Sequence, residues 1–501
     1  MTNISPNVHK PAARIAVIGS GFSGLSAAAV LASKGHNVSV FEKNATVGGR
    51  ARVFEADGFT FDMGPSWYWM PEVFERFYNL FGHTASDFYE LKRLDPSFTV
   101  VFGKDDVLNV PSDIDALYQL FESIETGSAA KLKSYLDDAA FKYKLGMDNL
   151  VYKPAASIFE FITGDVVKGM LSRNVFSSFT SHVKSHFKDP RLVALMEFPV
   201  LFLGAMPSET PALYSLMNHA GLKLGTWYPM GGFGKVVDAF KTIADEQGAT
   251  THISEPVQKL EVASNNVTRV SANGHSMNVD AVVGAADYHH IESALLDEAE
   301  RGYNEAYWDK KTFAPSCLIF YIGVNKRIDK LNHHTLFFDE DFNQHARDIY
   351  KEKQWTNKPL FYVCAPSRTD STVAPEGHEN LFVLMPVASG LVDSDENTEH
   401  YYNLLMERLE TYTGQAIRPN VVFKKSYSIS DFTKDYNAYK GNAYGLANTL
   451  MQTAMFKPKM QSKKIRNLFF AGQLTVPGPG VPPSIISGQV AANQVMKHLN
   501  R

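Results

Sequence analysis

The stretch of sequence that decides the fold is Arg14-Ile-Ala-Val-Ile-Gly-Ser-Gly-Phe-Ser-Gly-Leu-Ser-Ala-Ala-Ala29. Its apolar residues 15–18 predict a buried strand, and a helix is predicted from about residue 25 to residue 33. Between them stand three glycines in the spacing G-x-G-x-x-G: Gly19, Gly21 and Gly24. The first permits a tight turn, the second lets the backbone approach a pyrophosphate, and the third lets the helix pack against the strand.

A second β-like run, residues 37–41, ends on Glu42. A carboxylate about 20 residues after the glycine motif can accept hydrogen bonds from a ribose diol. The N-terminus of the predicted helix offers unpaired N–H groups and the positive end of its dipole to an anion. This order of strand, turn, helix and strand predicts a dinucleotide site. The alternative is a helix–strand unit in which the glycines serve packing alone.

Composition sets the limits for the rest of the chain. A length of 501 residues predicts two or three domains with a large core. The net charge of -4, without a basic stripe, argues against nucleic acid as a partner. The only two cysteines, Cys317 and Cys364, stand among apolar residues and are expected to be buried reduced thiols. No cysteine or histidine spacing suggests a metal site.

The sequence also bears on location. The first thirteen residues lack the apolar core of a signal peptide and are expected to be a disordered lead-in. No stretch reaches the length of a transmembrane helix. We therefore expect a cytoplasmic protein, either soluble or bound to one membrane surface.

Two short motifs follow Glu42 closely. Gly48-Gly49-Arg50 suits a loop that folds over a phosphate, with a solvated turn as the alternative. Further on, Phe61-Asp62-Met-Gly64-Pro65-Ser66 leads into three successive aromatic residues, Trp67-Tyr68-Trp69. Such large side chains need an apolar contact, which is either the protein core or a hydrophobic ligand.

The predicted secondary structure changes several times along the middle of the chain. Helical patterns run from residue 114 to about residue 224, and residues 155–210 are rich in apolar side chains. A buried helical domain is one interpretation of that region, and a surface that dips into a bilayer is the other. Patterns of β-α-β type return after residue 226, where Asp287 is expected to cap a helix, with His289 and His290 at the surface. Residues 310–425 alternate strands with one helix and predict an antiparallel sheet.

The C-terminal segment is sharply patterned. A strand ending at Gly472 is followed by the rigid loop of residues 474–483, and then by a helix from residue 484 to residue 498. Small residues share one face of this helix. A strand, a Gly-rich loop and a helix again present backbone N–H groups at a helix start, which suits a second part of a cofactor.

Taken in order, these motifs resemble the bacterial carotenoid desaturases of the phytoene desaturase type, from about residue 14 to residue 499. The early motifs are shared with the wider group of amine-oxidase-like flavoproteins. The loop Pro477-Gly-Pro-Gly-Val-Pro482 and the run Trp227-Tyr-Pro-Met-Gly-Gly232 are more specific. The aromatic run 67–69 and Gln473 depart from the family pattern, which bears on the substrate and not on the cofactor.

The resemblance implies an FAD enzyme that introduces double bonds into an acyclic C40 carotenoid, phytoene above all. Hydroxycarotenoid 3,4-desaturation is the alternative within the family; an amine oxidase and a non-catalytic prenyl-binding escort protein are alternatives outside it. Hydride leaves an allylic carbon for flavin N5, a neighbouring carbon loses a proton, and aromatic faces stabilise the transient cation. The implied location is the inner face of the cell membrane, with O₂ or a quinone as electron acceptor.

The implied architecture is α/β. A discontinuous Rossmann-like FAD-binding domain comprises residues 1–95, 226–300 and 431–501. A helical substrate region with the candidate membrane patch occupies residues 96–225, and an antiparallel-sheet substrate domain occupies residues 301–430.

Carried over by position, Glu42 would hold the adenosine ribose, Val257 would approach the adenine, and Gly64 and Pro65 would lie near the isoalloxazine. The full set of candidate cofactor-binding residues is Gly19, Gly21, Phe22, Ser23, Gly24, Glu42, Lys43, Gly48, Gly49, Arg50, Gly64, Pro65, Ser66, Val257, Gly472, Gly480, Val481 and Pro482. The candidate substrate-lining residues are Trp67, Tyr68, Trp69 and Trp227. No catalytic base and no metal ligand is predicted.

Overall fold

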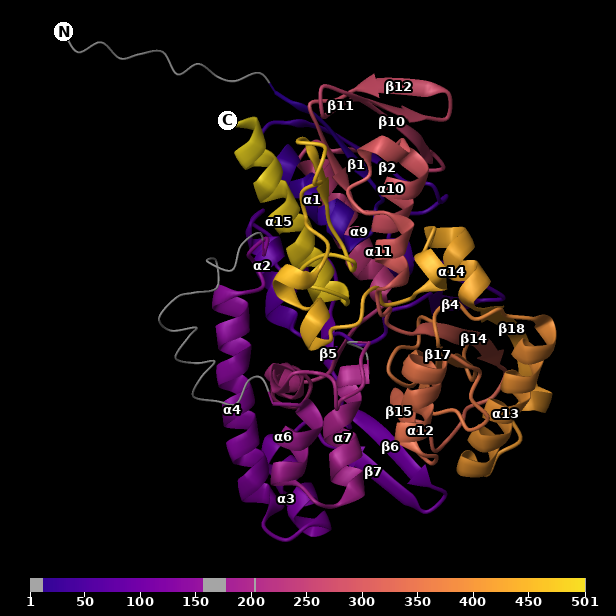
Figure 1. The fold of residues 1–501 in the computed structure, drawn as a ribbon. Helices are drawn as coiled ribbons and strands as arrows, with labels where there is room; N and C mark the ends of the chain where they lie inside the picture. The colour runs from indigo at the N-terminus through magenta and orange to yellow at the C-terminus, as the bar shows by residue number, and fades with distance from the viewer. Residues whose placement is uncertain (1–11, 156–176, 202–203, 501) are drawn as a thin grey trace.

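The computed structural model describes residues 12–155, 177–201 and 204–500, and it arranges them in two halves (Figure 1). One half is built on a parallel sheet and contains the first and last described residues of the chain. The other half is built on a larger mixed sheet and a group of helices. The expected disordered lead-in lies almost wholly outside the described residues. Part of the candidate membrane patch of residues 155–210, namely residues 156–176 and 202–203, lies outside them as well.

Five strands form the parallel sheet in the order β19-β13-β1-β2-β9. Ile15 pairs with Ala281 on one side and with Val38 on the other, so distant segments of the chain meet at the first strand. This arrangement confirms the predicted fold class, an α/β protein with a discontinuous Rossmann-like part. The strands are β1 (Arg14–Ile18), β2 (Asn37–Phe41), β9 (Thr250–His252), β13 (Ala281–Gly284) and β19 (Leu468–Phe470).

Alternation along β1 gives the parallel sheet two buried faces. Ile15 and Val17 join the apolar cluster formed with α1 (Phe22–Ala32), α9 (Phe233–Glu246) and α15 (Val481–Leu499). Ala16 and Ile18 face the opposite cluster, which includes α10 (Tyr288–Leu295). The same cluster contains a three-stranded antiparallel sheet: β10 (Val257–Ala263), β11 (Asn266–Ala272) and β12 (His275–Asn278). A strand covered on both sides needs an unbroken apolar run, which residues 15–18 provide.

Helices α1 and α15 approach each other closely because one of them carries a glycine at the contact. A Cβ placed on Gly488 would lie 2.2 Å from the carbonyl oxygen of Ser23. The small residues on one face of α15, noted in the sequence, therefore serve helix–helix packing. Both helices begin earlier than predicted, at Phe22 and at Val481, so the Gly-rich segments lead directly into their first turns.

Seven strands form the mixed sheet in the order β18-β14-β17-β16-β15-β6-β7. All neighbours are antiparallel except β15 and β6. The expected antiparallel layer is thus present, and it also includes two strands from earlier in the chain. The strands are β6 (Phe98–Gly103), β7 (Asp106–Val110), β14 (Ser316–Val324), β15 (His334–Phe337), β16 (Phe361–Cys364), β17 (Glu379–Val387) and β18 (Val421–Tyr427).

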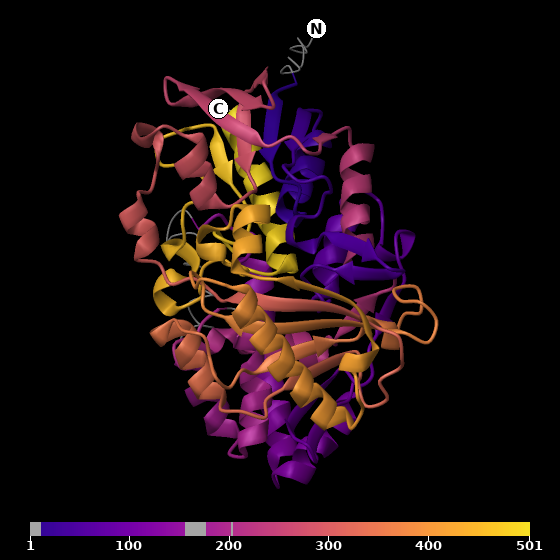
Figure 2. The same cartoon turned by 90° about the vertical axis from the view of Figure 1, so that its right-hand side faces the viewer.

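The two faces of the mixed sheet have different partners. Leu318 and Phe320 of β14 pack in the cluster that contains α13 (Asp395–Thr413), which crosses this face in Figure 2. The intervening Cys317 and Ile319 belong to the main cluster, on the side of the parallel sheet. Because side chains alternate along a strand, one face is closed by a helix and the other faces the rest of the protein. Both cysteines are buried free thiols, as expected.

Helices fill the far end of the second half. The helical pattern that begins at residue 114 forms first two helices, α3 (Ile114–Ile124) and α4 (Ser128–Asn149), separated by a turn at Gly127. With α6 (Phe179–His186) and α7 (Pro190–Leu201) they enclose buried side chains such as Leu192 and Phe198. The described part of the candidate membrane patch therefore packs inward. Among the described residues, no helix has the length and apolar character needed to cross a bilayer.

The remaining elements connect these layers. Two small antiparallel pairs are β3 (Val53–Ala56) with β4 (Phe59–Asp62), and β5 (Leu91–Arg93) with β8 (Trp227–Pro229). A turn at Asp57-Gly58 joins the first pair. The other α-helices of the described residues are α2 (Pro71–Asn79), α8 (Leu216–Asn218), α11 (Glu305–Asp309), α12 (Phe342–Arg347) and α14 (Ile429–Tyr436).

Candidate functional site

A cavity of about 550 Å³ lies between the carboxyl ends of the parallel strands and the mixed sheet. Its wall joins residues from the first and last segments of the chain. All the predicted cofactor-binding residues except Gly24 line this cavity. Gly24 instead lies against the first turn, where a Cβ would come within 1.9 Å of the carbonyl oxygen of Gly19. Its role is therefore packing, as the fingerprint implies for its third glycine.

Two Gly-rich segments face each other at the nucleotide end of the cavity. A Cβ on Gly49 would lie 3.2 Å from the Cα of Gly21, and Gly49 has a φ of +56°. Side chains at these positions would fill the space between the two backbones. The first turn of α1 begins here without a side-chain cap, with Gly21 at its N-cap position. The backbone can therefore approach an anionic ligand closely, as a pyrophosphate site requires.

Glu42 directly follows β2 and is 4% exposed at the cavity wall. One carboxylate oxygen accepts hydrogen bonds from the backbone N–H and hydroxyl of Ser20, at 3.0 and 2.8 Å. The other accepts from the backbone and side-chain amides of Asn44, at 2.8 and 2.9 Å. Ser20 and Asn44 thus fix the orientation of the carboxylate. Sequence reasoning missed both residues, because Ser20 occupies an unspecified position of the glycine motif and Asn44 lies outside it.

Arg50 supplies positive charge between the two ends of the cavity. Its guanidinium donates to the backbone oxygen of Asn442 at 3.1 Å and lies 5.0 Å from the ring centre of Tyr436. Its Nε is buried and has no hydrogen-bond partner among the described residues. A buried donor without a partner beside a cavity is a place where a ligand acceptor fits. We call the facing backbone segments at Gly21 and Gly49 the glycine cradle. The glycine cradle and this unpaired donor together fit an elongated, anionic dinucleotide.

Asp287 and the two histidines that follow it lie at the same end. The Asp287 carboxylate accepts from the backbone N–H of His290 at 3.2 Å and caps α10, as predicted. Burial raises the pKa of Asp287, and the charge of Arg50 opposes that shift. His290 lines the cavity, and burial lowers its pKa to about 4, so it is neutral at physiological pH. His289 instead contacts Glu305 at 2.9 Å and is only partly exposed.

The C-terminal loop closes the cavity from the other side. Gly480 precedes the first turn of α15 with a φ of +111°, and Gly472 has a φ of +108°. The backbone N–H of Gly472 donates to the hydroxyl of Ser487 at 3.0 Å, which ties the loop to the helix. Both glycines adopt backbone conformations that other residues rarely tolerate. The loop is thus held in a fixed shape over the cavity.

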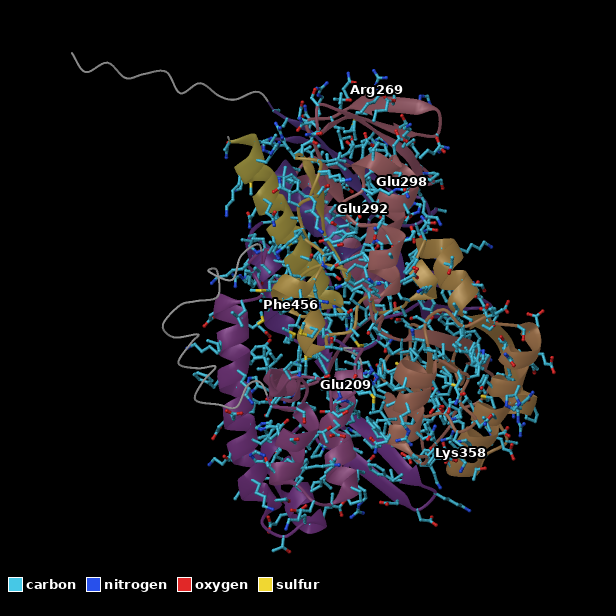
Figure 3. All side chains as sticks on the ribbon, viewed as in Figure 1. Glu209, Arg269, Glu292, Glu298, Lys358 and Phe456 are labelled. Atoms are coloured by element: carbon cyan, nitrogen blue, oxygen red, sulfur yellow. The ribbon has the colours of Figure 1, made fainter. Side chains whose placement is uncertain are left out.

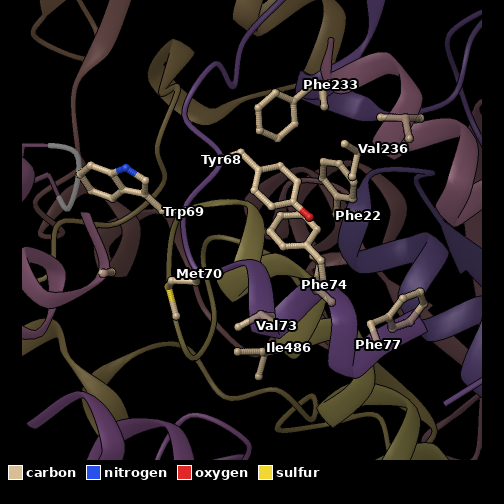
Figure 4. Close-up of a cluster of buried hydrophobic side chains, with 14 of the residues drawn as sticks. Phe22, Tyr68, Trp69, Met70, Val73, Phe74, Phe77, Phe233, Val236 and Ile486 are labelled. Atoms are coloured by element: carbon tan, nitrogen blue, oxygen red, sulfur yellow. The ribbon is translucent and has the colours of Figure 1, made fainter. Parts of the chain in front are cut away.

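Of the four predicted substrate-lining residues, Trp67 and Trp69 line the cavity, whereas Tyr68 and Trp227 do not. Tyr68 is fully buried, stacks on Phe74 at 4.2 Å, and bonds its hydroxyl to that of Tyr89 at 2.9 Å. Figure 4 shows Tyr68 pointing into an aromatic group with Phe233, away from Trp69. Successive residues of an extended segment point in opposite directions, so the middle aromatic residue enters the core.

The mixed sheet contributes a row of side chains that the sequence did not indicate. Ile319, Leu384 and Tyr362 are register partners across three adjacent strands, and all three line the cavity. Cys317 precedes this row by two positions on β14 and lines the cavity as well. Alternation along each strand marks these positions as facing one side, but only the pairing register reveals that they lie together.

The chain matches the family model described as flavin-containing amine oxidoreductase over residues 22–496. It is 40% identical over 486 residues to a carotenoid 3,4-desaturase of Haloarcula japonica, and the alignment covers 97% of this chain and 98% of that protein. It is 31% identical over 487 residues to a zeta-carotene-forming phytoene desaturase of Myxococcus xanthus, and this alignment covers 96% of this chain and 94% of that protein. A 4,4'-diapophytoene desaturase of Staphylococcus aureus is 28% identical over 500 residues.

Solved structures share the fold at low identity. An oxidoreductase from Methanosarcina mazei superposes with a TM-score of 0.62 at 18% identity, over 97% of this chain and 100% of that one. A putrescine oxidase bound to putrescine gives a TM-score of 0.62 at 15% identity, over 97% of this chain and 99% of that one. At such identities the likeness extends to the arrangement of the backbone and no further.

Proposed function

Because the chain belongs to the family of flavin-containing amine oxidoreductases, and within it to the carotenoid desaturases, we propose that it desaturates an acyclic C40 carotenoid of the phytoene type. The protein is an oxidoreductase and its cofactor is FAD. The observation that carries the proposed substrate is the cavity itself. It leads from the glycine cradle to a wall formed by Trp67, Trp69 and the Ile319–Leu384–Tyr362 row.

We propose that the glycine cradle and Glu42 hold the adenosine diphosphate part of FAD, with Val257 beside the adenine. Arg50 and the Gly64–Ser66 segment would then lie along the flavin, and the loop from Gly472 to Pro482 would close over it. Bound FAD supplies the acceptor for the hydride that leaves an allylic carbon. The protein's task is to orient the chain, exclude water and stabilise developing positive charge.

Trp67 and Trp69 are suited to stabilising the developing positive charge. Their rings lie 5.4 Å apart in an edge-to-face arrangement, and Trp69 is fixed by donating its indole N–H to the hydroxyl of Thr226 at 2.9 Å. The face of an indole attracts a delocalised cation, so both rings can stabilise the allylic cation as hydride departs. The non-catalytic prenyl-binding alternative has no support in a family of flavin-dependent enzymes.

A second candidate is desaturation at the 3,4 position of a carotenoid, and a specific observation favours it: the relative with 40% identity carries that name.

One experiment distinguishes the two candidates: the purified protein is incubated with FAD and either phytoene or a 1-hydroxylated carotenoid. Each added double bond lengthens the chromophore and moves its absorption to longer wavelength. A shift with phytoene supports the first candidate, and a shift with the hydroxylated substrate alone supports the second. No shift with either substrate contradicts both. Repeating the assay without oxygen, with and without a quinone, identifies the electron acceptor.

We further propose that the protein binds the inner face of the cell membrane, where carotenoids reside. Two apolar side chains in one short segment, Met451 and Phe456, are 69% and 49% exposed; Figure 3 labels the second. Flotation with liposomes tests this proposal, using a Met451→Ser, Phe456→Ser double variant. Val392→Ser, at a residue 83% exposed on another segment, is the matched control. If the active wild-type protein stays out of the liposome fraction, membrane binding is refuted.

A further inference from the structure

A short chain of polar groups lies directly behind the cavity wall. Ser66 and Tyr362 both line the cavity, and the hydroxyl oxygen of Tyr362 lies 3.0 Å from that of Ser66. The same Tyr362 oxygen lies 2.6 Å from Nδ1 of His334. Ser66 directly follows Gly64-Pro65, so this polar chain reaches the wall where the proposed flavin segment meets the aromatic residues. An apolar substrate alone gives no reason to bury such groups there.

The surroundings of His334 are unusual for a structural histidine. The residue is fully buried, and its Nε2 has no hydrogen-bond partner among the described residues. Its ring stacks on Trp67, with centroids 4.1 Å apart and planes inclined by 8°. Burial lowers the pKa of His334 well below its usual range and raises the pKa of Tyr362 well above its usual range. Both groups are therefore neutral before a reaction begins.

Desaturation releases a proton that no residue has yet been assigned to accept. After hydride has left one allylic carbon, the C–H bond of the neighbouring carbon breaks, and its electron pair becomes the new π bond. We propose that Tyr362 and His334 form the pair that takes up this proton. This inference rests on the proposed function. Tyr362 is the catalytic residue, because it lines the cavity, and His334, which does not line the cavity, is the positioning residue behind it.

The transfer balances within this pair. The Tyr362 oxygen takes the substrate proton while its own proton moves to Nδ1 of His334. The product is a neutral tyrosine and an imidazolium, and the hydride has already left in the proposed reaction. A carbon next to an allylic cation is a strong acid, so a weakly basic imidazole is sufficient. The imidazolium then lies on the face of Trp67, where the ring quadrupole attracts it. The 2.6 Å separation is short enough for direct transfer.

Two variants test the pair. Tyr362→Phe removes the hydroxyl, and His334→Asn keeps a polar group without a basic nitrogen. We expect product formation to fall by about 10²–10⁴-fold in each, the usual contribution of a general base. The FAD dissociation constant, measured by flavin fluorescence, should stay within about twofold of wild type. Tyr401→Phe is the matched control, because it removes a buried hydroxyl on α13 that donates to the Thr356 backbone oxygen at 2.8 Å.

An isotope measurement separates proton uptake from mere packing. With substrate deuterated at the carbon that loses the proton, both variants should show a larger isotope effect than wild type, because proton loss becomes slower. Unchanged rates in both variants, or the same small loss as in Tyr401→Phe, would overturn the pair. Loss of FAD affinity would also overturn it. If wild type desaturates no carotenoid, it is the proposed function that fails, and a product spectrum shows this directly.

Metal analysis of the purified holoenzyme tests the remaining alternative, which is that His334 binds a metal ion. His333, His334 and Cys364 are buried, and one potential ligand atom from each lies within 4.8 Å of the others. A metal ion found there in stoichiometric amount would overturn the proton-acceptor role, because a coordinated imidazole cannot accept the proton. A metal-free, active enzyme supports it.

Discussion

The carboxylate of Asp62 lies against the backbone of Gly232, so closely that a Cβ on the glycine would come within 2.6 Å of Oδ2. The two carboxylate oxygens accept hydrogen bonds from the backbone N–H groups of Phe233 and Gly234, at 2.9 and 3.1 Å. These are the first two residues of α9. Two motifs far apart in the sequence thus meet at one helix N-terminus, where a negative charge is favourable.

Gly232→Ala should lower the free energy of unfolding by about 1–3 kcal/mol, because the new methyl group overlaps Asp62 and the residue has a φ of +85°. Urea denaturation measures the loss. Gly274→Ala is the control: its φ is +77°, yet a Cβ there would meet nothing within 4 Å. If both variants lose the same stability, backbone strain alone explains the effect and the contact with Asp62 contributes nothing.

The Asp62 carboxyl should also make stability depend on pH. Burial raises its pKa to about 7, and the nearby Asp370 adds to the shift, although the two N–H donors oppose it. An aspartate in the unfolded chain has a pKa of about 3.9, so the folded state binds more protons between about pH 4 and pH 7. The contribution of Asp62 to stability is therefore lost as pH rises through this window. The unfolding temperature of Asp62→Asn, relative to wild type, should be higher at pH 8 than at pH 5. A constant difference would show that Asp62 keeps an ordinary pKa.

Cofactor affinity should depend on the facing glycines. Gly49→Ala places a methyl group 3.2 Å from the Cα of Gly21, inside the space between the two loops. We expect the FAD dissociation constant to rise at least about tenfold, equivalent to about 1.4 kcal/mol. Fluorescence titration of the apoprotein with FAD measures this. Gly35→Ala, at a φ of +82° with nothing within 4 Å of the added methyl group, should bind FAD as wild type does. Equal weakening in both variants would contradict the assignment of the cradle.

Much of the nucleotide end could be predicted from sequence because its signals are local. The run 15–18, the glycine spacing and Glu42 follow one another within one strand–helix–strand unit, and such units fold in one way. The small residues of α15 were visible as a helical face, although their partner, α1, was not. The double cap by Asp62 was not visible, since nothing near residue 62 indicates that its partners are the amides of residues 233 and 234.

The substrate end could be predicted only in part, for a physical reason. Trp67, Tyr68 and Trp69 look equivalent in the sequence, and only the path of the chain sends the middle one into the core. Tyr362 and His334 carry no motif. They come together through the register of β15 and β16, in which Leu336 pairs with Tyr362 and His334 with Cys364. Pairing between segments remote in sequence is set by the whole fold and not by local pattern.

Trp69, which lines the cavity, and Trp227, which does not, should respond differently to mutation. Trp69 packs so tightly on Gly221 that a Cβ on the glycine would lie 2.8 Å from its ring. Trp69→Phe removes ring area and the bond to Thr226, so we expect desaturation to fall by at least about tenfold, with FAD content unchanged. Trp227→Phe is the control, because Trp227 donates to the Leu224 backbone oxygen at 3.0 Å and does not line the cavity. Unaltered desaturation by Trp69→Phe would remove this residue from the substrate wall.

The buried Lys457 offers a further test of stability. It is 3% exposed, and its Nζ has no hydrogen-bond partner among the described residues. Burial lowers its pKa to about 7, whereas a lysine in the unfolded chain titrates at about 10.4. Between these values the unfolded state binds more protons, so wild-type stability rises with pH.

Lys457→Met keeps the length of the side chain and removes the charge. It should raise the unfolding temperature most at pH 7 or below, and the gain should shrink by pH 9.5. Lys310→Met, at an exposed lysine, should show no such trend. A gain that is the same at both pH values would mean that Lys457 is not held neutral by burial.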